Sequence, residues 1–247
     1  MRIDSDTFVF VLTGAGVSAE SGVPTFRGSG GLWENQPVER VASPEGFLAD
    51  PALVWRFYSE RRATAKQVTP NPGHHALAKL ESRLGDRFLL ATQNIDGLHQ
   101  RAGSQRVVEM HGSLWKTRCS RCDRPPFFDD AIYDVAKLPG CGRCDARGEF
   151  ALLRPHIVWF GERLDPVDIA AIEQFFARAA AHRFLFLAVG TSGAVFPAAQ
   201  LVSQAKRLGA ETFLINAEPA ANDQAFDHLI PGKSGEVLPP FLESLIS

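Results

Sequence analysis

Residues 13–28, TGAGVSAESGVPTFRG, carry the most structural information in this chain. They follow the apolar run FVFVL at residues 8–12, which predicts a buried strand. Residues 14–19, GAGVSA, fit the pattern G-x-G-x-x-G/A, in which a glycine-rich turn opens a helix. The glycines allow the backbone to approach a pyrophosphate, and the helix N-terminus offers N–H donors to it. The segment therefore predicts a dinucleotide site after the first strand of an α/β sheet.

The end of this segment departs from the ordinary dinucleotide-binding pattern. In that pattern the helix leads to a second strand that ends in Asp or Glu about 20 residues on. Here Gly22, Pro24 and further glycines interrupt the chain within a few turns. We therefore expect a short helix and then a mobile loop that carries Thr25, Phe26 and Arg27 beside the phosphate site. This arrangement suits a lid over a dinucleotide better than hydride transfer.

Two later strands are expected to bring polar side chains to the same site. The run FLLAT at residues 88–92 is followed by QNIDGLH at 93–99, and VVEM at 107–110 is followed by HGS at 111–113. Open α/β sheets bind ligands at the carboxyl ends of their strands. The sequence thus predicts that these segments meet beside the glycine-rich turn.

The four cysteines predict a metal site. Cys119, Cys122, Cys141 and Cys144 form two C-x2-C pairs separated by residues 123–140. This spacing is typical of a structural zinc ribbon, and four thiolates leave a tetrahedral zinc no open position. Disulfides or redox dithiols are the alternative, but a chain without a signal peptide disfavours disulfides. We expect one structural zinc ion, since no His or carboxylate lies at ligand spacing within the ribbon.

The composition is that of an ordinary globular protein. The 247 residues are 45% hydrophobic and 22% charged, with a net charge of −2. No strong field favours nucleic acid or a membrane surface, and no apolar run reaches 18 residues. The first strand begins so near Met1 that we expect no targeting segment and a cytoplasmic location.

Alternating strands and helices predict an α/β fold: a Rossmann-like parallel sheet with helices on both faces. The last third is expected to contain helices at 168–181, 200–208 and 239–246 and strands at 184–189 and 212–215. Residues 1–34, 72–113 and 152–247 are assigned to the large, Rossmann-like domain that carries the predicted dinucleotide site. The small domain would consist of a helical insertion, 35–71, and a zinc-ribbon module, 114–151, with the active site between the two domains.

In this order, the glycine-rich segment, TQNIDGLH, HGS and the paired cysteines resemble the sirtuin family over about residues 9–240. The resemblance implies a bacterial-type NAD-dependent protein deacylase with NAD as co-substrate. It makes His111 the general base, accepting a proton from a ribose hydroxyl, with Asn94 beside it in catalysis. The acyl group of a protein lysine would pass to ADP-ribose, giving free lysine, nicotinamide and 2′-O-acyl-ADP-ribose.

The resemblance also assigns the other cofactor contacts. Asn94 and Asp96 would hold the ribose and the nicotinamide carboxamide, although Asn94 would also suit an Asx turn that closes the strand. Phe26 would shield the ribose and Arg27 would meet a phosphate. The full set is Gly14, Ala15, Gly16, Ser18, Glu20, Thr25, Phe26, Arg27, Gln93, Asn94, Ile95, Asp96, Gly190, Thr191, Ser192, Asn216, Ala217, Glu218 and Lys233.

Two segments are assigned to the acyl-lysine substrate. Val158, Trp159, Phe160 and Gly161 match the loop that pairs with a bound peptide as an added strand between the domains and lines the lysine channel. Tyr58 and Arg61, at i and i+3 of one helix, resemble the signature of the sirtuin branch that removes succinyl, malonyl and glutaryl groups. A guanidinium can bind the distal carboxylate through two hydrogen bonds.

Other interpretations remain open on sequence alone. Arg61 could be one of several solvated helix charges. The enzyme could be mainly a deacetylase or a protein mono-ADP-ribosyltransferase, which would share the NAD site. A non-enzymatic alternative is an NAD-sensing module with a zinc ribbon, although nothing in the charge pattern favours a nucleic-acid partner. The physiological targets and the oligomeric state cannot be deduced from the sequence.

Overall fold

The computed structural model describes residues 2–24, 32–33 and 36–246. Thr25, Phe26 and Arg27, expected in the lid, lie outside the described residues. Within the part that is described, no helix is both long and apolar enough to cross a membrane.

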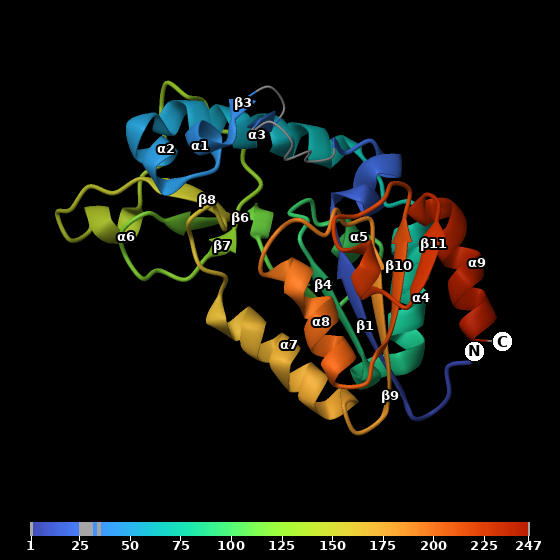
Figure 1. Ribbon diagram of the computed structural model, residues 1–247. Helices are drawn as coiled ribbons and strands as arrows, with labels where there is room; N and C mark the ends of the chain where they lie inside the picture. The colour runs from blue at the N-terminus through green and yellow to red at the C-terminus, as the bar shows by residue number, and fades with distance from the viewer. Residues whose placement is uncertain (1, 25–31, 34–35, 247) are drawn as a thin grey trace.

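A six-stranded parallel sheet forms the centre of the larger part of the molecule (Figure 1). Its strand order is β11-β10-β9-β1-β4-β5. The order reverses between β1 and β9, so the loops that follow these two strands flank the crevice where such sheets bind ligands. The strands are β1 (Thr7–Thr13), β4 (Phe88–Thr92), β5 (Val107–Glu109), β9 (Arg183–Val189), β10 (Glu211–Asn216) and β11 (His228–Pro231).

Helices cover both faces of this sheet, as the sequence predicts (Figure 1). Because side chains alternate along a strand, Phe8 and Phe10 of β1 pack with α7 (Pro166–Ala179) and α8 (Leu201–Arg207). Val9 and Val11 face the opposite way, toward α4 (Pro72–Leu84) and α9 (Ser234–Ile246). The Rossmann-like architecture is therefore confirmed.

A second group of elements lies beside one end of this sheet (Figure 1). It contains a three-stranded antiparallel sheet of order β7-β6-β8, together with the 17-residue helix α3 and shorter helices. Residues from 38–65 and 114–159 share a single hydrophobic cluster, and we propose on that ground that both predicted insertions form one small domain. The elements are β2 (Leu32–Trp33), β3 (Gln36–Pro37), α1 (Val38–Val41), α2 (Pro44–Ala49), α3 (Pro51–Gln67), β6 (Gly112–Cys119), β7 (Phe127–Phe128), α6 (Gly142–Asp145) and β8 (Leu153–Ile157).

Several boundaries differ from the sequence prediction for physical reasons. The helix after the glycine-rich turn is short, as expected, and it is a 3-10 helix, Ala15–Ser21, closed by Gly22 at a φ of 88°. Helix α9 begins at Ser234 rather than at the predicted Pro239, because its apolar face packs from Leu238 onward against the sheet. Packing of that face outweighs the helix-breaking tendency of the two prolines. The remaining helical segments are α5 (Leu98–Arg101) and three further 3-10 turns.

Candidate active site

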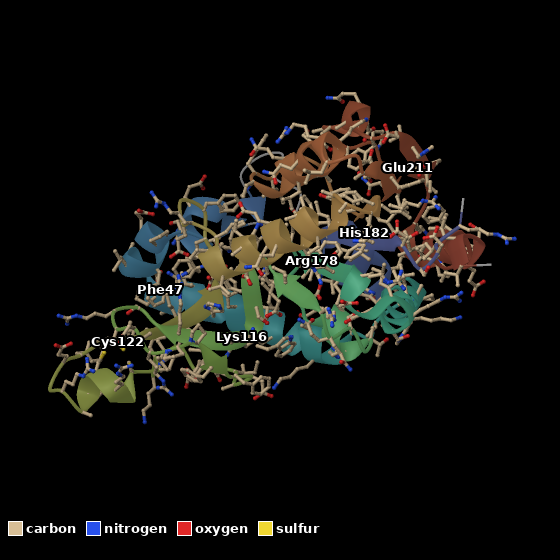
Figure 2. The ribbon with its side chains drawn as sticks, turned by 90° about the horizontal axis from the view of Figure 1, so that it is seen from below. Phe47, Lys116, Cys122, Arg178, His182 and Glu211 are labelled. Carbon is tan, nitrogen blue, oxygen red and sulfur yellow. The ribbon has the colours of Figure 1, made fainter. Side chains whose placement is uncertain are left out.

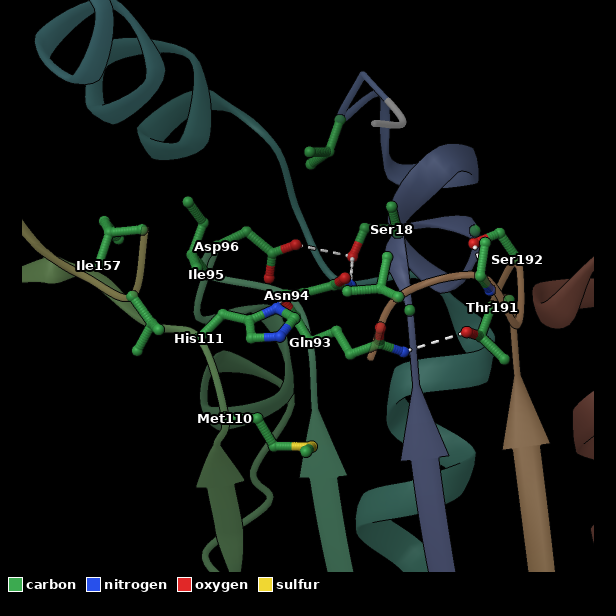
Figure 3. Close-up of a pocket in the computed structure, with 18 of the residues that line it drawn as sticks. Ser18, Gln93, Asn94, Ile95, Asp96, Met110, His111, Ile157, Thr191 and Ser192 are labelled. Atoms are coloured by element: carbon green, nitrogen blue, oxygen red, sulfur yellow. Dashed lines mark hydrogen bonds between the residues drawn. The ribbon is translucent and has the colours of Figure 1, made fainter. Parts of the chain in front are cut away.

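A cavity of about 2100 Å³ lies where the loops after β1, β4, β9 and β10 meet the small domain (Figure 3). Every described residue that the sequence assigned to the cofactor lines it. These are Gly14, Ala15, Gly16, Ser18, Glu20, Gln93, Asn94, Ile95, Asp96, Gly190, Thr191, Ser192, Asn216, Ala217, Glu218 and Lys233. His111, Arg61, Val158, Trp159, Phe160 and Gly161 also line it.

Three glycines hold the loops after β1 and β9 together at the strand-order reversal. A Cβ added to Gly14 would lie 2.7 Å from the carbonyl oxygen of Gly190. A Cβ added to Gly16 would lie 2.7 Å from the Cα of Gly190. Gly190 itself has a φ of +63°, and a Cβ there would meet the backbone nitrogen of Val17. The glycines are thus required first for this close packing of two loops, before any phosphate is considered.

His111 lies at the crossing between the two sheets. The chain leaves β5 at Glu109 and enters β6 at Gly112, so only two residues separate the sheets. Gly112 has a φ of +80°, and a Cβ there would meet the carbonyl oxygen of His156. This turn holds the imidazole at the cavity wall, close to Gln93 (Figure 3).

The hydrogen bond of the His111 ring fixes its tautomer. His111 Nδ1 lies 3.1 Å from the carbonyl oxygen of Gln93, and because a carbonyl only accepts, Nδ1 must carry the proton. The lone pair of the neutral ring is then on Nε2. Burial lowers the pKa of His111 below the ordinary histidine value. The imidazole is therefore neutral near pH 7 and able to accept a proton through Nε2.

A second polar group surrounds Ser18 (Figure 3). The Ser18 hydroxyl donates to Asp96 Oδ2 at 2.8 Å and accepts from Asn94 Nδ2 at 3.1 Å. The amide of Leu98 donates to the other Asp96 oxygen at 2.8 Å. The carboxyl group is almost fully buried, and burial raises the pKa of Asp96. The backbone N–H of Asn94 donates to Thr92 Oγ1 at 3.0 Å, so the turn after β4 is closed by the side chain of Thr92.

The loops at the other half of the cavity are cross-linked to each other. Gln93 Nε2 donates to Thr191 Oγ1 at 3.0 Å, and Asn216 Nδ2 donates to the Thr191 carbonyl at 3.0 Å. Glu20 accepts from the Gly235 amide at 2.6 Å, which ties the glycine-rich segment to the start of α9. Lys233 is mostly exposed and lies 3.5 Å from Glu236. Hydrogen bonds thus cross-link several of the loops that carry the predicted cofactor residues.

The two residues predicted to form the acyl pocket lie in different surroundings. Arg61 is 8% exposed and lines the cavity, with its Nη1 donating to the Phe57 carbonyl at 2.6 Å and its guanidinium 3.1 Å above the Phe57 ring. Arg61 is therefore not a solvated surface charge. Tyr58 is 0% exposed and is not among the described residues that line the cavity. Its hydroxyl accepts a hydrogen bond from Trp159 Nε1 at 3.0 Å.

Sequence reasoning did not predict the ion pair between two charged residues that shape the predicted peptide loop, 158–161. Arg154 forms two hydrogen bonds with Glu162, Nη1 to Oε1 at 2.7 Å and Nη2 to Oε2 at 2.9 Å. Glu162 also accepts from the Trp159 amide at 2.9 Å. In the sequence, only the position of Arg154 before the loop and of Glu162 at its end indicated this interaction. The missed His74 lies behind the cavity, 3.4 Å from the Ser18 hydroxyl, and it carries no sequence signal beyond its place after a helix cap.

The four cysteine side chains form a cluster that suits zinc. Their sulfur atoms all lie within 4.8 Å of one another, and the Cys119–Cys144 and Cys122–Cys141 pairs are each 3.8 Å apart. A tetrahedral zinc ion with Zn–S bonds of about 2.3 Å requires sulfur–sulfur distances of about 3.8 Å. None of the four forms a disulfide. The Cys122 amide donates to Cys119 Sγ at 3.3 Å, as expected for a thiolate ligand.

This cluster lies away from the proposed chemistry. Figure 2 shows Cys122 at one end of the molecule, while His182 and Glu211, near the starts of β9 and β10, lie toward the other. None of the four cysteines is among the described residues that line the cavity. The site has four sulfur donors and leaves no position for a substrate, so its role is structural.

Sequence comparison finds relatives along nearly the whole chain. The NAD-dependent protein deacylase of Escherichia coli strain K12 is 48% identical over 240 residues, which cover 96% of this chain and 82% of that protein. The NAD-dependent protein deacylase of Pasteurella multocida strain Pm70 is 45% identical over 240 residues, covering 96% and 97%. NAD-dependent protein deacylase 2 of Pyrobaculum aerophilum is 48% identical over 241 residues, covering 95% and 90%.

Solved structures agree with this result. A Sir2 homologue in complex with NAD is 40% identical, superposes with a TM-score of 0.85, and matches 96% of this chain and 88% of its own. A Sir2 homologue variant bound to 2′-O-acetyl-ADP-ribose is also 40% identical, with a TM-score of 0.84 and coverage of 96% and 91%. Residues 14–197 match the pattern that defines the Sir2 family. This chain therefore belongs to the Sir2 family.

Proposed function

We infer that this chain is an NAD-dependent protein deacylase, and we propose that it prefers acyl groups that end in a carboxylate. Family membership and the deacylase relatives support the reaction. The acyl preference is supported by one observation above all, the buried Arg61 guanidinium at the wall of the cavity that His111 also lines.

The described residues fit NAD as the co-substrate. The loops after β1 and β9 line the cavity beside three glycines, and Thr191 and Asn216 form the rim next to them. The Ser18, Asn94 and Asp96 group offers an acceptor carboxylate and an amide in a buried place, which suits a carboxamide. When bound, NAD would supply the electrophilic ribose carbon from which nicotinamide leaves.

His111 would act as the general base in this reaction. Its Nδ1–H is held by the Gln93 carbonyl, so Nε2 is the ring atom available to a ribose hydroxyl. The lowered pKa keeps that nitrogen unprotonated near pH 7. Removing the hydroxyl proton makes the oxygen nucleophilic enough to attack the acyl carbon.

Arg61 would recognise the end of the acyl group. A succinyl or malonyl carboxylate that enters the cavity must leave water, which is costly unless a cation receives it. A guanidinium can donate two parallel hydrogen bonds to a carboxylate. An acetyl group has no carboxylate and would gain nothing from this residue.

The acyl-lysine peptide would bind along residues 158–161. In this structure the Val158 amide donates to the His111 carbonyl at 2.9 Å and the Phe160 amide donates to the Ala42 carbonyl at 3.0 Å. These bonds anchor the loop to both parts of the molecule. Pairing with a peptide as an added strand would therefore use other backbone groups of the loop, its carbonyls foremost.

The test is a comparison of kcat/KM for succinyl-, malonyl- and acetyl-lysine peptides of identical sequence, with NAD saturating and nicotinamide release as the signal. We expect the two acidic acyl groups to exceed acetyl by at least about tenfold, which corresponds to about 1.4 kcal/mol. Equal or higher deacetylation would refute the preference and leave the deacylase activity standing. Absence of NAD-dependent release with all three peptides would refute both.

A further inference from the structure

Trp115 joins the small domain to the loop that carries Asp96. The residue lies on β6, the strand that begins directly after His111. Its Nε1–H donates to the backbone carbonyl of Asp96 at 2.7 Å. We propose that Trp115 is a positioning residue for the nicotinamide end of NAD, because it holds loop 95–97 where Asp96 lines the cavity. This inference rests on the proposed function, in which the Asp96 group receives the nicotinamide carboxamide.

The indole also packs directly against the backbone of Gly97. A Cβ added to Gly97 would lie 2.5 Å from Trp115 Nε1 and 2.7 Å from Trp115 Cδ1. Gly97 has a φ of +74°, a conformation that favours glycine. The loop therefore turns against the indole with no side chain between them. Packing and the hydrogen bond to Asp96 are two separate contacts of the same ring with this loop.

Trp115 completes a set of hydrogen bonds in which every oxygen atom of Asp96 accepts. Ser18 donates to Oδ2 and the Leu98 amide donates to Oδ1, each at 2.8 Å. These two bonds hold the carboxylate, and the Trp115 bond holds the peptide group that follows it. A carboxylate has further lone pairs, which can accept from a carboxamide N–H. Trp115 is not among the described residues that line the cavity, so it would act on the cofactor through Asp96.

The strand that presents the indole is itself anchored. The Leu114 amide donates to the Ile95 carbonyl at 2.9 Å, and the Asp129 amide donates to the Trp115 carbonyl at 2.9 Å. β6 is also the central strand of its sheet, paired with both β7 and β8. Ile95 and His111 both line the cavity (Figure 3). One strand therefore fixes the loop and the base relative to each other.

Trp115→Phe tests the inference, because phenylalanine keeps an aromatic ring and lacks the N–H donor. The assay follows deacylation of the acyl peptide that the wild type converts fastest, with ADP-ribose, which lacks the nicotinamide, as a competitor of NAD. We expect KM for NAD to rise about 2- to 12-fold, as for loss of one hydrogen bond, while the inhibition constant of ADP-ribose changes little. The nicotinamide concentration that halves the rate should rise as well.

The matched control is Trp55→Phe. Trp55 is a buried tryptophan whose Nε1–H also donates to a backbone carbonyl, that of Leu153, at 3.0 Å. The substitution therefore removes the same kind of hydrogen bond away from loop 95–97. It should lower stability and leave KM for NAD and the ADP-ribose constant unchanged. If Trp115→Phe does not fold, benzothienylalanine at this position removes the N–H and keeps the shape of the indole.

The outcomes separate this inference from the proposed function. A wild-type chain that frees no lysine in the presence of NAD would overturn both. Wild-type turnover with no change in KM for NAD in Trp115→Phe would overturn only the role of Trp115. Equal weakening of NAD and ADP-ribose would also overturn that role, since it would indicate a general structural loss. So would a selective rise of KM for NAD in Trp55→Phe.

Discussion

Replacing Arg61 with methionine should convert the enzyme toward a deacetylase. Arg61 is 8% exposed and lines the cavity, so a carboxylate that reaches it forms a largely desolvated ion pair. Loss of one partner from such a pair costs about 2–5 kcal/mol. At about 1.4 kcal/mol per tenfold, kcat/KM for desuccinylation should fall about 30- to 3,000-fold. Deacetylation should change little, because the acetyl group makes no such pair.

The ratio of the two kcat/KM values is the appropriate assay. It cancels losses shared by both reactions, including the packing of the Arg61 stem and its contacts with Phe57. Arg56→Met is the matched control, since Arg56 lies on the same helix and is exposed. It should leave the ratio unchanged. If Arg61→Met lowered both activities equally, Arg61 would be a structural residue and the proposed acyl preference would lose its support.

Three further predictions concern the base, the metal and the glycine-rich loops. Because burial lowers the pKa of His111, kcat/KM should rise with pH through a pKa below about 6.5 and be level by pH 7; an acid limb centred above 7 would argue against His111 as the base. Elemental analysis should find one zinc per chain, and Cys141→Ser should lower the Tm by about 6–12 °C if the metal contributes about 3 kcal/mol; unchanged stability and activity in metal-free protein would contradict a structural zinc. Gly190→Ala should weaken NAD binding far more than Gly209→Ala. Both glycines have a positive φ, but only at Gly190 would the added methyl group meet neighbouring backbone. Equal effects on NAD binding would mean that backbone strain, and not this close packing, causes the loss.

The fold and the convergence of the site could be predicted because their signals are local. Each buried strand is directly followed by the polar residues that it delivers, as with Gln93 after β4 and His111 after β5. Parallel strands place all these ends at one edge of the sheet, so no long-range information was needed. The zinc cluster was equally accessible, because its spacing is a local pattern at both pairs.

Contacts between distant segments could not be predicted. Helical spacing places Tyr58 and Arg61 on one face of the helix. It does not predict that Trp159, 101 residues later, donates a hydrogen bond to the Tyr58 hydroxyl. Likewise, the glycine pattern predicts a close approach of backbone, and the approach that is present is to Gly190, in the loop that follows β9. The start of α9 depends on which apolar residues the sheet covers, which outweighed the local preference of proline for a first turn.

The central claim is that the acyl group passes to ADP-ribose at this site. The most direct measurement incubates the protein with NAD and a succinyl-lysine peptide and quantifies every product by mass spectrometry. We predict one nicotinamide and one succinyl-ADP-ribose for each lysine freed, and no freed lysine without NAD. Free succinate formed without NAD consumption, or ADP-ribose retained on the peptide or the protein, would contradict the account.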